Sequence, residues 1–398
     1  MTSSDNFSHF TPPCYPGTVQ LEQHRLEAAQ MLASSDRPAD AYVTALEYQF
    51  SQYTGSRFAI AYSSGAQGLR LCLQALGIQS GDLVITTAFA GPSAIQALLS
   101  QGAVPVLVDV EPHTGNIDPH LVFAATQDIM QGGKHARAWL PPTVTSNDAT
   151  LKAVLPVDVS GQTADLELIM NTAWKYRIKV IEDACESLGS AYKQHKAGAL
   201  ADFGIYNFYC NEQTHPTTAG MLVTDEPQPA EQIIALRDHA QGINGAPTQG
   251  PRMSQSARPD PQAAALGLVY LKHMQERVAR RMLVAGWYRQ YLSGLSNIEL
   301  PLIANYTSQM GWPVFVIHLQ AGCDRSAVIQ QLAAKGIPAT PYHQPLHLQP
   351  SMTGRFGYRP GTFPVAEDLG TRSLALPISE LMEQLHVEQV CEALRKSI

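Results

Sequence analysis

Short apolar runs alternate with stretches of helical spacing between residues 42 and 225. Each run has the length of a strand, and most are followed by about ten residues whose apolar positions repeat at helical intervals. This alternation is typical of a parallel sheet whose strands are joined by right-handed helical crossovers. The runs are FAIAYSS (58–64), DLVITTAF (82–89), VPVLVDV (104–110), LKAVLPVDVSG (151–161) and KVIEDACES (179–187).

The pattern changes on either side of this region and suggests three parts. We predict an N-terminal arm over residues 1–20, a large α/β domain with a mostly parallel mixed sheet over 21–262, and a smaller C-terminal α+β part over 263–398. The third part is expected to begin with one long amphipathic helix, 263–295, that bridges the domains. The stretch 132–152 has no periodicity and is predicted to be a surface loop.

Polar residues follow several of the apolar runs. Because ligands of such sheets bind at the carboxyl ends of the strands, the site is expected there. The residues concerned are Ser63 to Ala66, Thr86 to Ser93, Asp158, and Glu182 with Asp183.

Composition and charge narrow the function classes. The chain has 398 residues, 45% hydrophobic residues and a net charge of −7, which argues against nucleic acid or an anionic membrane as partner. Its six cysteines form no CxxC pair, which favours reduced thiols. The polar N-terminus shows no secretory signal, so a cytoplasmic protein is expected. No metal site is expected either, since the histidines do not place two ligands on one helix face.

Several segments, in order along nearly the whole chain, resemble the DegT/DnrJ family of aminotransferases. They include LEYQFSQYTGSRFAIAYSSGAQGLRLCLQALGIQSGDLVIT, GAVPVLVDVEPHTGNIDP, VSGQTADLELI, VIEDACESLGSAY, ADFGIYNFY, PLHLQPS and GTFPVAEDLGTRSLALPI. The resemblance implies a fold type I enzyme that uses pyridoxal phosphate (PLP) to aminate keto-sugars. It also implies a large domain with a mixed, mostly parallel sheet, a small C-terminal α+β domain, and a homodimer.

The family's Schiff-base lysine has no counterpart at its expected position. The resemblance places that lysine four residues after the strand end Tyr206–Phe208, at Glu212, and no lysine occurs from 197 to 271. Glu212 is interpreted either as a general base or as an ordinary loop residue. His215 is a second candidate, because one branch of the family replaces the lysine with histidine and holds PLP without a covalent bond.

Other cofactor contacts of the family are also altered. Asn207 stands for a phosphate-binding serine, Ala66 for a threonine in the Ser64–Gly65–Ala66 turn, and Gly91 for the aromatic residue that stacks on the pyridine ring. Asp183 keeps the carboxylate that pairs with the pyridine nitrogen. We also assign Asp158, Glu186, Tyr342 and His343 to the substrate or vestigial cofactor pocket; the last two lie in TPYHQPLH, which resembles a family segment.

These substitutions lead to the expectation that no cofactor is bound and that PLP-dependent transamination has been lost. The protein would then be a repurposed enzyme or a binding protein for a small, sugar-like molecule. Two alternatives stay open: an enzyme of nucleotide-sugar metabolism that holds PLP or pyridoxamine phosphate (PMP) non-covalently, and a non-catalytic partner of an intact aminotransferase.

Overall fold

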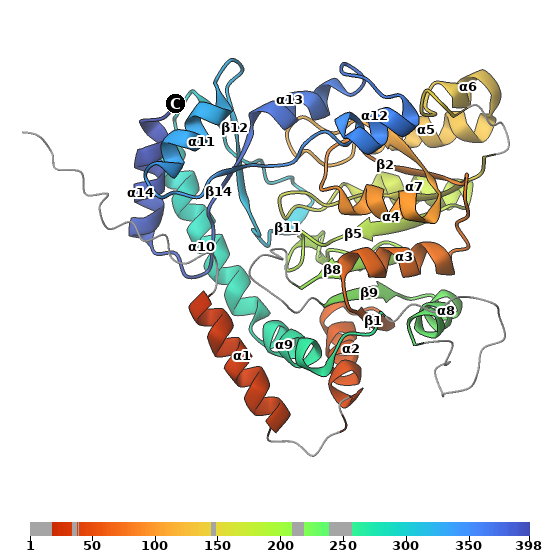
Figure 1. Ribbon diagram of the computed structural model, residues 1–398, viewed down its shortest axis with the longest axis horizontal. Coiled ribbons are helices and arrows are strands. Elements are labelled where there is room, and N and C mark those ends of the chain that lie inside the picture. The colour runs from red at the N-terminus through yellow and green to blue at the C-terminus, as the bar shows by residue number, and fades with distance from the viewer. Residues whose placement is uncertain (1–17, 34–37, 39, 145–148, 209–218, 239–256) are drawn as a thin grey trace, which may run out of the picture.

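The computed structural model describes residues 18–33, 38, 40–144, 149–208, 219–238 and 257–398, and the side chains from residue 23 onward. A seven-stranded sheet lies at its centre, in the order β1-β9-β8-β5-β4-β2-β3 (Figure 1). The strands β8, β5, β4, β2 and β3 run parallel, while β9 is antiparallel to both β1 and β8. The expected mostly parallel mixed sheet is therefore confirmed. The bounds are β1 Phe58–Tyr62, β2 Leu83–Thr87, β3 Val104–Val108, β4 Leu151–Leu155, β5 Lys179–Asp183, β8 Phe203–Asn207 and β9 Gly220–Thr224.

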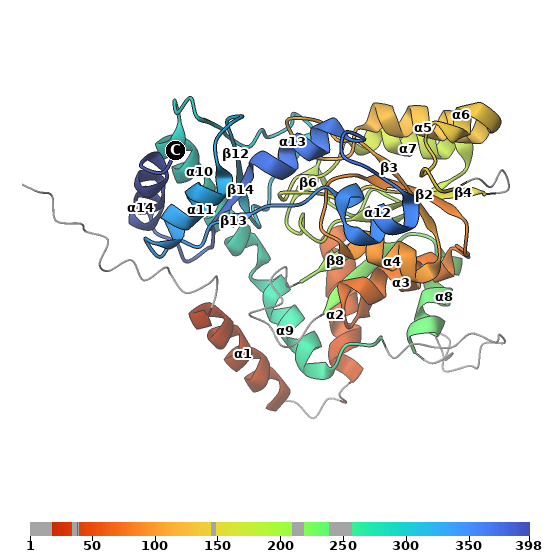
Figure 2. The ribbon, with the colours of Figure 1, turned by 45° about the horizontal axis from the view of Figure 1, so that its top comes forward.

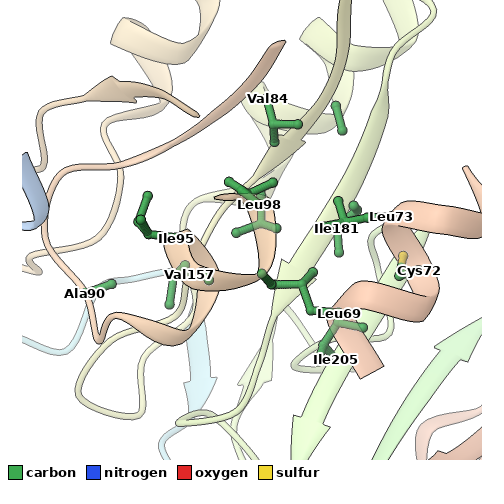
Figure 3. Close-up of a cluster of buried hydrophobic side chains, with 14 of the residues drawn as sticks. Leu69, Cys72, Leu73, Val84, Ala90, Ile95, Leu98, Val157, Ile181 and Ile205 are labelled. Carbon is green, nitrogen blue, oxygen red and sulfur yellow. The ribbon is translucent and has the colours of Figure 1, made fainter. Parts of the chain in front are cut away.

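Helices cover both faces of this sheet. On one face, α3 (Gly65–Ala75), α4 (Ser93–Gln101) and α8 (Pro227–Arg237) pack on side chains such as Val84 and Ile181. Figure 3 shows Leu69, Cys72 and Leu73 of α3 and Leu98 of α4 meeting the sheet there. On the other face lie α5 (Pro119–Gln131) and α7 (Leu166–Tyr176) over one half of the sheet, and α2 (Asp40–Thr54) and α9 (Pro261–Lys272) over the other. Because both faces are covered, all residues of β2 and β9 are buried.

Two expectations about local structure need correction. The predicted loop over 132–152 contains a short helix, α6 (Gly133–Arg137), and the first residues of β4. The predicted continuous helix over 263–295 is two helices, α9 and α10 (Met274–Leu292), which meet at His273. The first helix, α1 (Thr18–Ala33), begins within the predicted arm and packs on α9.

The C-terminal region builds its own core around a second sheet in the order β10-β12-β14-β13. Its strands are β10 Ile298–Glu299, β12 Phe315–Leu319, β13 Thr340–Pro341 and β14 Ser373–Leu376; α10, α11 (Arg325–Ala333) and α14 (Gln384–Arg395) pack against it. The helices α12 (Pro350–Phe356) and α13 (Pro364–Arg372) extend from this sheet toward β2, β3 and α4 (Figure 2). A small third sheet contains β6 Ala191–Tyr192, β7 His195–Lys196 and β11 Thr307–Gln309. None of the described helices is long and apolar enough to cross a membrane.

Candidate functional site

The carboxyl ends of β2, β4 and β5 and the turn from β1 into α3 lie along one edge of the large sheet. Backbone hydrogen bonds connect β5 to its two neighbours at this edge. Asp158 N–H, just after β4, donates to Asp183 O (3.0 Å), and Ala184 N–H, just after β5, donates to Ile205 O of β8 (2.8 Å). The segments expected to carry the site are therefore brought together by the parallel register of the strands.

The first turn of α3 forms one wall of this edge. Ser64 is its N-cap residue, with extended backbone (φ −160°), and its hydroxyl does not cap the helix. A Cβ added to Gly65 would lie 3.7 Å from Asn207 Nδ2 and 4.0 Å from Cys185 Sγ, so β8 and the turn after β5 approach this helix end closely. The N–H groups of a first helical turn have no partner within the helix and favour an anion. Ala66 follows in the same turn and is exposed.

Asp183 lies at the end of β5 and is only 5% exposed. Burial raises the pKa of its carboxyl, with a further contribution from nearby Glu186, although hydrogen bonding with Cys185 opposes the shift. No described lysine, arginine or histidine forms an ion pair with it. Asp183 is therefore a buried carboxylate that a cationic group of a ligand would stabilise.

Asp158 lies below this edge and is fully buried. Its carboxylate accepts hydrogen bonds from Ser187 Oγ and from Ala164 N–H (2.9 Å). Burial raises its pKa to about 7, and its neighbour Glu182, also fully buried, has a pKa well above the usual range for the same reason. Asp158 therefore lies beneath the edge rather than on its surface.

One cluster joins residues that are far apart in the sequence: Glu186, Tyr342 and His343. Glu186 and Tyr342 are 156 residues apart. The Tyr342 hydroxyl donates to Glu186 and accepts from Ser160 N–H (2.7 Å). His343 Nε2 lies 3.1 Å from Glu186 Oε1, within ion-pair distance, although the direction of approach does not meet hydrogen-bond geometry. A Cβ added to Gly91 would lie 3.6 Å from His343 Cε1. Four predicted pocket residues thus form one cluster.

The two other predicted catalytic residues, Glu212 and His215, lie outside the described residues, so their roles remain predictions. Sequence reasoning did not single out Ser160 or Phe89, which complete the cluster around Tyr342 and His343. The left-handed backbone of Ser160 (φ 58°) turns its N–H toward Tyr342, and no sequence signal marks it.

Comparison with known proteins gives relatives named for polysaccharide biosynthesis and for GDP-perosamine synthesis. The chain is 29% identical to the spore coat polysaccharide biosynthesis protein SpsC of Bacillus subtilis, over 98% of this chain and 97% of that protein. It is 30% identical to GDP-perosamine synthase of Caulobacter vibrioides, with 89% of each chain covered. The crystal structure of NtdA from Bacillus subtilis with bound PMP superposes with a TM-score of 0.75 at 25% identity, covering 95% of this chain and 83% of that one.

These findings correct one expectation. The absence of a cofactor was inferred from lost contacts, but NtdA was solved with its cofactor PMP, and the matching family model describes aminotransferases. The inference failed because it counted substituted side chains, whereas the helix terminus and the buried carboxylate described above are both retained. The model of the DegT/DnrJ/EryC1/StrS aminotransferase family matches residues 20–395, and the chain belongs to that family.

Proposed function

We propose that this protein is a PLP- or PMP-dependent enzyme of sugar biosynthesis, and that it holds its cofactor without a Schiff base from the segment 209–218. One observation carries the proposal: the N-terminus of α3 and the buried carboxylate of Asp183 lie on the same sheet edge. Among the described residues, Asp183 has no ion-pair partner. The class of substrate is suggested by the relatives, one of which is named a GDP-perosamine synthase.

The residues present fit the two ends of such a cofactor. The first turn of α3 offers backbone N–H groups to a phosphate, and Gly65 lets Asn207 of β8 approach this turn closely, since an added Cβ would lie 3.7 Å from Asn207 Nδ2. Asp183 offers a carboxylate to a protonated pyridine nitrogen, and such a partner would lower its raised pKa. When bound, the cofactor supplies an electron sink for the carbon atom that reacts. The chain's own residues orient it at its two ends.

The sequence supports a non-covalent mode of binding. No lysine occurs from 197 to 271, so the segment 209–218 has no side-chain amine that could form an imine with PLP. Affinity must then come from the phosphate contacts and from Asp183. Losing one charge-assisted contact of this kind costs about 1.5–3 kcal/mol, or roughly 10- to 100-fold in affinity.

Titration of the purified protein with PLP and with PMP tests the proposal. We expect saturable binding of both, a higher melting temperature with PMP, and removal of either by dialysis. After borohydride treatment, peptide mass spectrometry should find no stoichiometric adduct on a lysine. Asp183→Asn should weaken PMP binding about 10- to 100-fold. Absence of binding by the wild type rejects the proposal, and a stoichiometric adduct on one lysine rejects its non-covalent part.

We also propose that the protein is a homodimer. The support is the family resemblance, because fold type I enzymes build their sites across a dimer interface. Light scattering at micromolar concentration should give twice the chain mass of 43.2 kDa. A monomer would contradict this proposal, and co-purification with a different aminotransferase chain would favour a heteromer.

A further inference from the structure

The cluster of Glu186, Tyr342 and His343 connects the C-terminal region to the sheet edge that holds Asp183. Tyr342 and His343 directly follow β13, whereas Glu186 lies in the turn after β5, three residues beyond Asp183. The side chain of His343 is 15% exposed and that of Glu186 27%. The pair is therefore partly shielded from water and still open to the edge.

The imidazole of His343 is fixed from several sides. Its ring packs edge-on against Phe89 (5.7 Å between centroids) and lies next to the ring of Tyr342 (4.0 Å). Nε2 faces Glu186, and Cε1 lies 3.6 Å from where a Cβ at Gly91 would be. The loop after β2 and the turn after β5 thus both lie against the imidazole.

The carboxylate beside this imidazole is kept ionised. Burial alone would raise the pKa of Glu186, but His343, the Tyr342 hydroxyl and the Ser160 N–H together bring that pKa below its usual value. Asp183 is the other acid close to Glu186, and its own pKa is raised. An ionised carboxylate beside one ring nitrogen holds an imidazole in a fixed orientation.

We propose that His343, oriented by Glu186, is the proton-transfer group of this site. The inference rests on the proposed function, since the reaction then requires a group that moves a proton and the segment 209–218 contains no lysine to do so. In the step assigned to it, a C–H bond of the bound substrate breaks and an N–H bond forms at Nδ1, the ring nitrogen that does not face Glu186. A cofactor held between the first turn of α3 and Asp183 would supply the electron sink for the electron pair of that bond. Return of the proton reverses these changes, so no oxidant or reductant is required.

Tyr342 and Glu186 act as positioning residues in this arrangement. Glu186 aligns the imidazole, and Tyr342 fixes Glu186 through its hydroxyl, which in turn accepts from Ser160 N–H. Removal of the Glu186 charge should therefore slow proton transfer less than removal of the imidazole.

The first experiment is chemical footprinting and does not depend on turnover. Diethyl pyrocarbonate modifies accessible imidazoles, and mass spectrometry measures the rate at each histidine. We expect saturating PMP to slow modification of His343 at least about fivefold. His273, whose Nε2 lies 3.3 Å from Glu27 Oε2 at the junction of α9 and α10, is the control and should react at the same rate with and without PMP. Equal rates at His343 with and without PMP would overturn the proposal.

The second experiment measures exchange of the α-hydrogen of L-glutamate with D2O in the presence of PLP. His343→Gln should slow exchange about 10²- to 10⁴-fold, and Glu186→Gln about 10-fold, with PLP saturating for each variant. His273→Asn should exchange at the wild-type rate. If His343→Gln exchanges at the wild-type rate while Glu212→Gln or His215→Asn loses exchange, proton transfer belongs to Glu212 or His215. That result rejects the inference. A wild type that binds PLP but exchanges no hydrogen also rejects it and leaves the proposed function standing, whereas a wild type that binds neither PLP nor PMP rejects both.

Discussion

At the scale of single residues, the acidic side chains near the site are unusually well buried. Asp158, Glu182 and Asp183 are each at most 5% exposed, and burial raises the pKa of all three. Glu182 has Asp158 and the Gly198 N–H as polar neighbours, but within the described residues neither forms a well-aligned hydrogen bond with its carboxylate. Ionising such groups in the folded protein costs free energy, so these residues lower stability where they are charged.

The titration of Asp158 should appear in the pH dependence of stability. Its pKa is about 7 in the folded protein and about 3.9 in an unfolded chain. Between these values the folded state binds more protons, so the free energy of unfolding falls as pH rises from about 4 to 7. We expect Asp158→Asn, which can still accept from Ala164 N–H, to gain on the order of 1–3 kcal/mol over wild type between pH 4.5 and 8. Urea unfolding at several pH values measures this, and equal slopes for the two proteins would contradict it.

Residue-level prediction succeeded where the local sequence contained the signal. Asp183, Ser64 and Gly65 follow strands of a parallel sheet, so their place on the edge could be predicted from the order of elements alone. The pairing of His343 with Glu186 could not, because it depends on how the C-terminal region packs on the large sheet. Both residues were expected in the pocket, but not as partners.

At the scale of elements, the position of α3 depends on one tyrosine ring. Tyr62 at the end of β1 is fully buried, and its hydroxyl donates to Tyr206 O (2.5 Å). Added Cβ atoms at Gly68 of α3 and Gly220 of β9 would each lie 2.1 Å from this ring, on its two sides. The ring thus fits only between two glycines, and it sets how closely the N-terminus of α3 approaches β8 and β9.

Gly68→Ala should therefore destabilise the protein. The new methyl group would overlap a ring that is held on its other side, and overpacking of this kind costs about 1–3 kcal/mol. The matched control is Gly286→Ala in α10, where nothing lies within 4 Å and helix propensity predicts a gain of about 0.5–1 kcal/mol. Chemical denaturation of both variants is the measurement. A Gly68→Ala variant as stable as wild type would show that Tyr62 does not fix the helix.

The break between α9 and α10 shows where element prediction was limited. Helical spacing continues through His273, so the sequence predicts one helix. In the structure, α9 packs against α1, α2 and side chains of the large sheet, whereas most of α10 packs on the C-terminal core. The helix axis changes where the chain passes from one core to the other. Periodicity within a segment carries no information about which core each part will meet.

At the scale of the whole molecule, the C-terminal region is attached along the site edge of the large sheet. Leu346 N–H donates to Ala88 O (2.8 Å), and Gln162 Oε1 accepts from Ala304 N–H (2.7 Å). Asp109, just after β3, accepts from the N–H groups of Val365 (3.0 Å) and Ala366 (2.9 Å) at the start of α13. The contacts that attach this region therefore lie close to the residues assigned to the site.

Asp109, which follows β3 of the large sheet, thus caps α13 of the C-terminal region. Loss of its carboxylate should loosen the attachment of that region to the large sheet. We expect Asp109→Ala to lower the free energy of unfolding by about 1–2 kcal/mol, as loss of a helix cap does, and to speed backbone hydrogen exchange in α13 and in the segment 340–346. Asp118→Ala is the matched control, because Asp118 caps α5, a helix that packs on the large sheet. Its carboxylate accepts from the N–H groups of His120 and Leu121. Asp118→Ala should cost a similar free energy while leaving hydrogen exchange at 340–346 unchanged.

Because His343 lies in the segment 340–346, Asp109→Ala should also weaken the protection of His343 by PMP. If both variants alter exchange at 340–346 equally, Asp109 is an ordinary cap and the C-terminal region is held in place by other contacts.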